Sequence, residues 1–345
     1  MFLTGRIVLV SSVTKAGVPM STGSASPPAA TAPNVILTKD LRKVYPSPGG
    51  GREGFTAVGG LDLSVRRGEI FGLLGPNGAG KTTTVGMLTT RVVPTSGTAE
   101  VNGVDVVDDP SRVKHFIGVV HQLNTLDRSL NAWENLYFHG RYYGMAAKAA
   151  RQAADEQLER FRLTHRARSE VRTLSGGMVR RLMVARAVLH RPAVLFLDEP
   201  TANLDPQSRL ALWEILNEIR TGGQTILLTT HYMEEADEFC DRVAIIDHGR
   251  VLALGTPARL KRYVAEREGT GLTVAAWLSK VRAEARRGGP GSAGEARPLD
   301  DPRLEAALME LVEAADRHGV DLNDLRRGVT LETVFFRLTG RDLRE

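Results

Sequence analysis

The sequence has little of what a secreted or membrane-spanning protein needs. It holds one cysteine, Cys240, among 345 residues, so no disulfide can form within the chain, and a reducing compartment is expected. The longest apolar runs, such as residues 193–197, fall far short of the ~20 residues that cross a bilayer. Aromatic residues make up only 6% of the chain, so any local cluster of them calls for a reason.

The net charge of the chain does not by itself identify a binding partner. The formal net charge of +5 could indicate nucleic acid, but acidic and basic residues are mixed along the chain without a polybasic block. A basic surplus equally suits a protein that works against an anionic membrane leaflet, and composition does not separate the two. With 42% hydrophobic residues, the chain is long enough to bury one large α/β core and a small appended domain.

Short apolar runs alternate with helical patterns from residue 34 onward, which predicts an α/β domain with a mainly parallel sheet over residues 34–258. Helical spacing dominates from about residue 133 to 162, and we expect a helical subdomain at about 124–180. The predicted strands lie at 35–37, 61–65, 70–74, 117–120, 194–197, 225–229 and 243–246.

The two ends of the chain differ from this central domain in composition and in predicted structure. Residues 1–33 are rich in small and polar residues and predict a flexible tail. Residues 259–302 predict a helical segment followed by a Gly/Pro linker, and residues 303–345 a small C-terminal domain. Two amphipathic helices are expected there, at 303–318 and 330–339, packed on each other or across a dimer. The second helix would bury Leu331, Val334, Phe335 and Leu338.

A glycine-rich stretch follows the predicted strand at 70–74 and opens a helical run. Its glycines let successive backbone N–H groups point inward around a phosphate, Lys81 adds a positive charge, and Thr82 can bind Mg²⁺. This is the context that a Walker A loop requires, so the stretch predicts nucleotide binding. The predicted binding residues are Gly75, Pro76, Asn77, Gly78, Ala79, Gly80, Lys81, Thr82 and Thr83.

Four further side chains follow predicted strands and can complete such a site. Asp198 is expected to hold Mg²⁺ through its water shell, and Glu199 to polarise the attacking water. His231 can reach a γ-phosphate, and the amide of Gln122 can contact Mg²⁺ or the lytic water. A histidine or glutamine after a strand is otherwise an ordinary surface residue, so these two need support from elsewhere.

That support comes from residues 174–178, which read Leu-Ser-Gly-Gly-Met and resemble the Leu-Ser-Gly-Gly-Gln signature of the ABC (ATP-binding cassette) ATPases. In family order, Tyr45 resembles the adenine-stacking aromatic, Gln122 the Q-loop glutamine, Asp205 the D-loop aspartate, and His231 the switch histidine. The resemblance implies a P-loop cassette with antiparallel β and α-helical subdomains, and it implies ATP and Mg²⁺ as ligands.

The resemblance also implies partners. Ser175, Gly176 and Gly177 would cap a helix starting near Val179 and bind the ATP of a second copy, so that two cassettes sandwich two nucleotides head to tail. Met178 departs from the family glutamine. Residues 180–182, 138–141 and 331–341 are similar to the daunorubicin-resistance group of ATP-binding proteins. That group implies a subunit on the cytoplasmic face of the membrane that powers an ABC-2 type permease and exports drugs, antibiotics or other amphipathic molecules.

Two other functions compete with this interpretation. A soluble ABC ATPase acting on nucleic acid or ribosomes would use the same ATP site. Such proteins usually carry two cassettes or long coiled coils, whereas this chain has one Walker A loop and one signature, so no nucleic acid is expected. A regulator that does not hydrolyse ATP would be expected to lack Glu199 or His231, and both are present.

An aromatic cluster follows Gln122. Helical spacing predicts a shared buried face for Trp133, Tyr137 and Phe138. Tyr142 and Tyr143 continue this stripe and bring hydroxyl groups, as interface residues often do. The cluster is therefore either a subdomain core alone or a core with a groove for the membrane partner, and the family resemblance favours the groove.

Overall fold

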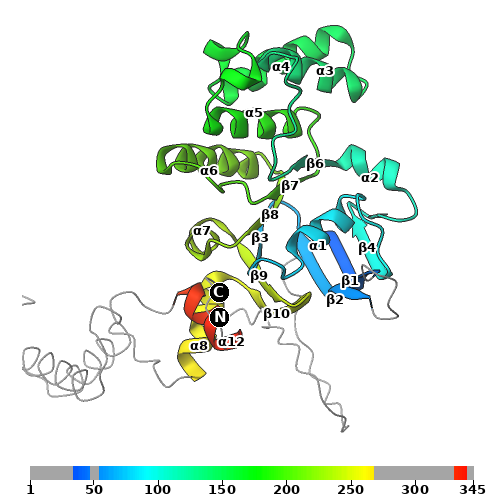
Figure 1. Ribbon diagram of the computed structural model, residues 1–345, viewed down its shortest axis with the longest axis vertical. Coiled ribbons are helices and arrows are strands. Elements are labelled where there is room, and N and C mark those ends of the chain that lie inside the picture. The colour runs from blue at the N-terminus through cyan, green and yellow to red at the C-terminus, as the bar shows by residue number, and fades with distance from the viewer. Residues whose placement is uncertain (1–33, 47–53, 268–329, 340–345) are drawn as a thin grey trace, which may run out of the picture.

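A six-stranded sheet runs through the middle of the computed structural model, which describes residues 34–46, 54–267 and 330–339 (Figure 1). The strand order is β10-β9-β3-β8-β7-β6, and every neighbouring pair is parallel except β10 with β9. The predicted mainly parallel sheet is confirmed, and β10 is an unpredicted antiparallel addition. Its strands are β3 (Ile70–Leu74), β6 (Ile117–Val120), β7 (Val194–Asp198), β8 (Thr225–Thr230), β9 (Arg242–Asp247) and β10 (Arg250–Gly255).

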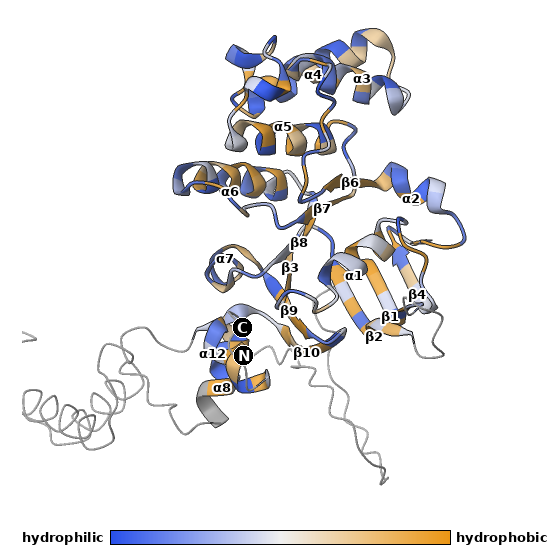
Figure 2. Cartoon of the chain, viewed as in Figure 1, coloured by the Kyte–Doolittle hydropathy of each residue, from blue (hydrophilic) through white to orange (hydrophobic). Residues whose placement is uncertain are grey.

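Helices cover both faces of this sheet, and most residues of its parallel strands are therefore buried and apolar (Figure 2). On β3, Phe71 and Leu73 join the apolar cluster that contains α1, whereas Ile70 and Leu74 join the cluster that contains α5, α6 and α7. This alternation fixes which face each strand residue supports. The covering helices are α1 (Lys81–Leu88), α5 (Gly176–Val188), α6 (Pro206–Thr221) and α7 (Met233–Phe239).

A second, antiparallel sheet with the order β2-β1-β4-β5 packs on the α1 side, as the resemblance implied. Its first two strands are much longer than the short runs at 35–37 and 61–65. The reason is a register shift between Thr38 and Leu41, where Asp40 adopts a positive φ of 45° and breaks the apolar alternation. The strands are β1 (Asn34–Tyr45), β2 (Phe55–Arg66), β4 (Ser96–Val101) and β5 (Val104–Asp105).

The segment between β6 and β7 is helical, as the spacing predicted (Figure 1). The helical pattern at 133–162 corresponds to two helices, because the chain turns at Gly144, whose φ is 81°. Asn131 and Glu134 form a capping box that starts the first of them. None of the described helices is long and apolar enough to cross a membrane. Besides α5, this segment holds α3 (Ala132–Tyr142), α4 (Ala147–Arg160) and the short 3₁₀ turns η1 (Thr164–Arg166) and η2 (Val171–Thr173), while α2 (Pro110–Phe116) directly precedes β6.

The last described helix, α12 (Leu331–Thr339), confirms the helix expected at 330–339. It packs against α7 and α8 (Pro257–Arg267), both part of the main body (Figure 1). Val334 and Phe335 are buried within the same apolar cluster as α5, α6 and α7. The expected partners were a helix at 303–318 or a second copy. Residues 303–318 lie outside the described residues, as do the tail at 1–33 and residues 268–302 of the helical segment and linker expected at 259–302.

We predict that Phe335→Ala lowers the melting temperature while ATP binding persists. Phe335 is 2% exposed, and removing a buried phenylalanine costs about 3 to 5 kcal/mol of packing. The neighbouring Phe336 is 49% exposed, so Phe336→Ala is a matched control that should leave the melting temperature nearly unchanged. Equal melting temperatures for the two variants would show that α12 does not stabilise the main body.

Candidate functional site

The ends of four parallel strands bring the predicted catalytic residues to one edge of the central sheet. β3, β8, β7 and β6 are neighbours in this order, and parallel pairing places all their carboxyl ends on the same side. The glycine-rich loop follows β3, His231 follows β8, Glu199 follows β7, and Gln122 lies two residues past β6. Side chains separated by more than 100 positions in the sequence therefore meet.

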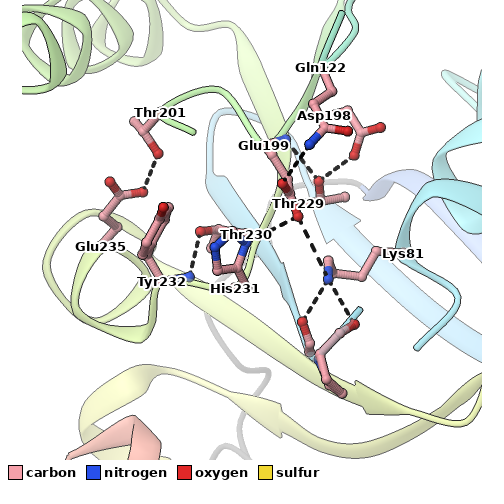
Figure 3. Close-up of polar contacts among 12 residues, drawn as sticks. Lys81, Gln122, Asp198, Glu199, Thr201, Thr229, Thr230, His231, Tyr232 and Glu235 are labelled. Atoms are coloured by element: carbon pink, nitrogen blue, oxygen red, sulfur yellow. Dashed lines mark hydrogen bonds and ion pairs between the residues drawn. The ribbon is translucent and has the colours of Figure 1, made fainter. Parts of the chain in front are cut away.

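The carboxylate of Glu199 is the meeting point (Figure 3). Gln122 Nε2 donates to Glu199 Oε2 at 3.1 Å, and His231 Nδ1 lies 3.2 Å from Glu199 Oε1. Lys81 Nζ lies 4.0 Å from the same Oε1 atom. Three residues predicted for the site from separate motifs thus contact a fourth. This carboxylate can accept a proton from a water molecule held at the sheet edge.

The backbone of Glu199 is held in a strained conformation. Its φ is 45°, a left-handed value that costs a residue with a side chain about 1 to 2 kcal/mol. Thr229 opposes this strain, because its carbonyl oxygen and its Oγ1 both accept hydrogen bonds from the Glu199 N–H, at 3.2 and 3.0 Å. Arg180 holds the other side of the peptide, since it donates to the Glu199 carbonyl oxygen at 2.9 Å.

Arg180 and Thr229 are functional residues that the sequence analysis missed. Arg180 appeared there only as a mark of family resemblance, yet it is 6% exposed and also donates to the His121 carbonyl oxygen at 2.7 Å, next to Gln122. Burial lowers the pKa of Arg180, while Asp198 and Glu199 oppose that effect. Helix α5 also holds Arg181 and Arg186, so the residue type of Arg180 did not single it out in the sequence. Thr229, a threonine in an apolar strand, carried no signal either.

The glycine-rich loop is built to receive phosphate. Gly78 and Gly80 have φ values of 82° and 100°, which favour glycine and turn the backbone around the loop. Within the described helix α1, no side chain caps the N-terminus and no acidic residue lies in the first turn, so the first N–H groups and the positive dipole end suit an anion. These features fit the phosphates of ATP.

The lysine of this loop is held ready by its own backbone. Lys81 Nζ donates to the carbonyl oxygens of Gly75 and Pro76, at 2.7 and 2.9 Å. Burial lowers the pKa of Lys81, and the nearby Glu199 and Asp198 carboxylates oppose that effect. A buried ammonium group with two carboxylates beside it offers the strong point charge that a β- or γ-phosphate needs.

A Mg²⁺ ion fits the residues predicted for it. Asp198 is 7% exposed, and its Oδ1 accepts from Thr229 Oγ1 at 2.6 Å, which orients the carboxylate. Thr82 is an exposed residue in the first turn of α1. Gln122 uses its amide nitrogen on Glu199, so its carbonyl oxygen is the atom suited to a cation. Carboxylate, hydroxyl and amide oxygens form the hard donor set that Mg²⁺ prefers.

The residues of the predicted signature stand apart from the loop. Ser175 caps α5, which begins at Gly176 rather than near Val179, and its hydroxyl accepts from Met178 N at 3.3 Å. A Cβ atom on Gly177 would lie 2.3 Å from Ser208 Oγ, so a glycine is needed where α5 meets α6. Among the described residues, no hydrogen bond joins Ser175, Gly176 or Gly177 to the glycine-rich loop.

Two more predicted binding residues are likewise not joined to the loop by hydrogen bonds in the described part of the chain. Asp205 caps α6 and accepts from Ser208 N at 2.9 Å. Tyr45 pairs with Phe55 at the end of the β1–β2 ladder, and Lys43 Nζ lies 5.1 Å from the centre of its ring. Thr83 lies half-buried in the first turn of α1.

This arrangement is that of a P-loop nucleoside triphosphatase, in which catalysis consists of positioning a phosphate, a metal ion and a water molecule. The family model described as ABC transporter matches residues 58–202. The chain is 42% identical over 316 residues to the Nod factor export ATP-binding protein I of Ralstonia nicotianae, covering 90% of this chain and 95% of that protein. It therefore belongs to the ABC transporter family, as an ATP-binding subunit that hydrolyses ATP.

Two further comparisons agree. The chain is 43% identical over 293 residues to the daunorubicin resistance ATP-binding protein DrrA3 of Streptomyces coeruleorubidus, covering 84% of this chain and 92% of that protein. Among solved structures, it is similar to a dimeric ATP-binding cassette in a post-hydrolysis state bound to ADP and Pi. The TM-score is 0.59 at 26% identity, over 64% of this chain and 98% of that one.

We predict that Glu199→Gln abolishes ATP turnover while ATP still binds, because the amide keeps the shape of the carboxylate but cannot accept the proton. Lys81→Ala should instead weaken ATP binding, since it removes the buried charge of the loop. Equilibrium binding of a fluorescent ATP analogue and release of phosphate separate the two effects. Normal phosphate release by the Glu199 variant would rule out Glu199 as the general base.

Proposed function

We propose that the chain powers an efflux transporter, in which it works with an ABC-2 type membrane subunit to export drugs, antibiotics or other amphipathic molecules. The observation that carries the proposal is the match to two export and resistance ATP-binding proteins over at least 92% of their length. Neither the match nor the site favours an action on nucleic acid. Peripheral attachment to the cytoplasmic face of the membrane follows from this role.

We further propose that two copies act head to tail. Within one chain, no described hydrogen bond links the capped start of α5 at Ser175 to the glycine-rich loop, although this helix start offers N–H groups to a phosphate. The similar solved cassette is described as dimeric. A second copy would bring its Ser175, Gly176 and Gly177 to the ATP held by Lys81, and Asp205 and Tyr45 would contribute to the same closed site. ATP and Mg²⁺ would thus be shared between copies.

The membrane partner would contact the exposed part of the aromatic cluster. Trp133 and Tyr137 stack at 5.0 Å and pack against the core, whereas Phe138 is 51% exposed, contrary to the buried face predicted for all three. Tyr142 is 86% exposed at the end of α3. Tyr143 was grouped with it from the sequence, but it stacks on His190 with ring centres 3.9 Å apart. Exposed aromatic rings of this kind serve as anchors for a partner.

A complementation experiment tests the head-to-tail dimer. Lys81→Ala and Ser175→Arg should each abolish turnover in a dimer made of identical copies. When the two variants are mixed, a mixed dimer keeps one intact pair of loop and signature, so phosphate release should exceed the sum of the two separate rates. Each variant mixed with itself is the control. A rate no higher than that sum would show that both residues act on the same ATP within one chain.

A transport assay tests the partner surface. In cells that express the chain with the membrane protein that co-purifies with it, Tyr142→Ala should raise doxorubicin accumulation, because it removes an exposed anchor. ATPase activity and melting temperature of the isolated variant should stay unchanged. Tyr143→Ala is the contrasting variant and should lower the melting temperature, since it removes a half-buried stacked ring. Normal doxorubicin efflux in the Tyr142 variant would exclude this residue from the coupling surface.

A further inference from the structure

A buried carboxylate, that of Glu235, contacts Thr201 near the catalytic residues (Figure 3) and also contacts Arg209. Glu235, in the first turn of α7, is 5% exposed. Its Oε2 accepts a hydrogen bond from Thr201 Oγ1 at 2.6 Å, and its Oε1 lies 3.3 Å from Arg209 Nε. None of these three side chains contacts Glu199 or Lys81 through a described hydrogen bond, so they form a second layer beside the site.

The two partners of Glu235 bracket one loop. Thr201 stands at the start of the turn that leads from β7 to α6, where its carbonyl oxygen accepts from Leu204 N at 3.2 Å. Arg209 lies in the first turn of α6, and its N–H donates to the Asp205 carbonyl oxygen at 3.0 Å. One carboxylate thus holds both ends of residues 202–205. This is the loop that contains the predicted D-loop.

The same carboxylate is tied to the switch histidine. Helix α7 begins two residues after His231, and its N-cap residue is Tyr232. The ring of Tyr232 lies 4.1 Å from that of His231, centre to centre, and Arg209 Cζ lies 5.2 Å from the centre of the Tyr232 ring. Two routes therefore join the loop to His231: one through Glu235 and α7, the other through Arg209 and Tyr232.

A contribution to folding stability does not by itself explain why Glu235, Thr201 and Arg209 are placed together. Burial raises the pKa of Glu235, and the hydrogen bond from Thr201 and the charge of Arg209 act against that rise. A buried carboxylate is expensive to desolvate, and a well-packed apolar residue of similar size often serves stability equally well. A buried ionic group is better suited to fixing the relative position of the elements that it joins.

We propose that Glu235 is a positioning residue that couples the loop at 202–205 to His231, and through it to the Glu199 carboxylate. Held by Thr201 and Arg209, α7 keeps the His231 ring 3.2 Å from Glu199. When the loop shifts, α7 and the ring shift with it. The inference rests on the role proposed for His231 in hydrolysis, and it makes turnover sensitive to the position of the loop that carries Asp205.

The test compares steady-state ATP hydrolysis by full-length variants. Glu235→Ala should lower kcat by about tenfold or more, the expected effect of losing a hydrogen bond to a charged group, with the KM for ATP within about twofold. Glu235→Gln keeps an acceptor for Thr201 and should recover most of this loss. Glu238→Ala, at an exposed position on the same helix, is the matched control and should match the wild-type kcat.

Thr201→Val keeps the test informative if Glu235→Ala does not fold, because it removes the same hydrogen bond at nearly constant volume. It should lower kcat and leave KM unchanged. Normal kcat in Thr201→Val and in any soluble Glu235 variant, while His231→Ala loses turnover, would overturn the inference and leave the proposed function intact. Normal turnover in His231→Ala would instead remove the premise. A fall in kcat matched by a rise in KM and a lower melting temperature would assign Glu235 a structural role only.

Discussion

The parallel register of β3, β8, β7 and β6 is the constraint on which the rest of this protein depends. Parallel strands end on the same side of the sheet. Side chains from the loops that follow them can therefore converge on one group, here the Glu199 carboxylate. The strained backbone of that residue is stable only because Thr229 and Arg180 hold its peptide from both sides. The strain therefore belongs to the site and is supported by the packing of α5 against the sheet.

Two kinds of polar contact surround this point, and they act on different parts of the reaction. Lys81, Gln122 and His231 touch Glu199 directly and are placed to act on phosphate, metal and water. Arg180 and Glu235 are buried behind them and contact backbone or neighbouring side chains instead. The buried groups of the second kind keep the catalytic side chains in position. This matters because a shift of about 1 Å in a catalytic group can lower the rate by a hundredfold.

The residues proposed to contact partners are exposed, whereas those that anchor the C-terminal helix are buried. The start of α5 at Ser175 and the exposed ring of Tyr142 remain available at the surface. Helix α12, by contrast, is anchored by buried residues in the same apolar cluster as α5, α6 and α7. Its position beside α7 places this C-terminal helix next to the element that follows His231.

The sequence by itself determined the chemistry of the site and the class of fold. A glycine-rich loop after an apolar strand, an acid pair after another and the helix cap at Ser175 are local features, so each can be recognised from adjacent residues. The helix at 330–339 was equally readable from its spacing.

Only the tertiary structure decided which side chains meet. The convergence on Glu199 follows from strand order, and the roles of Arg180 and Glu235 follow from packing between helices distant in sequence. Tyr142 is exposed and the adjacent Tyr143 is half-buried, because the Tyr143 ring stacks on His190, which is distant in the sequence. The type of a side chain indicates which chemistry it can perform, but the fold determines which other side chains it contacts.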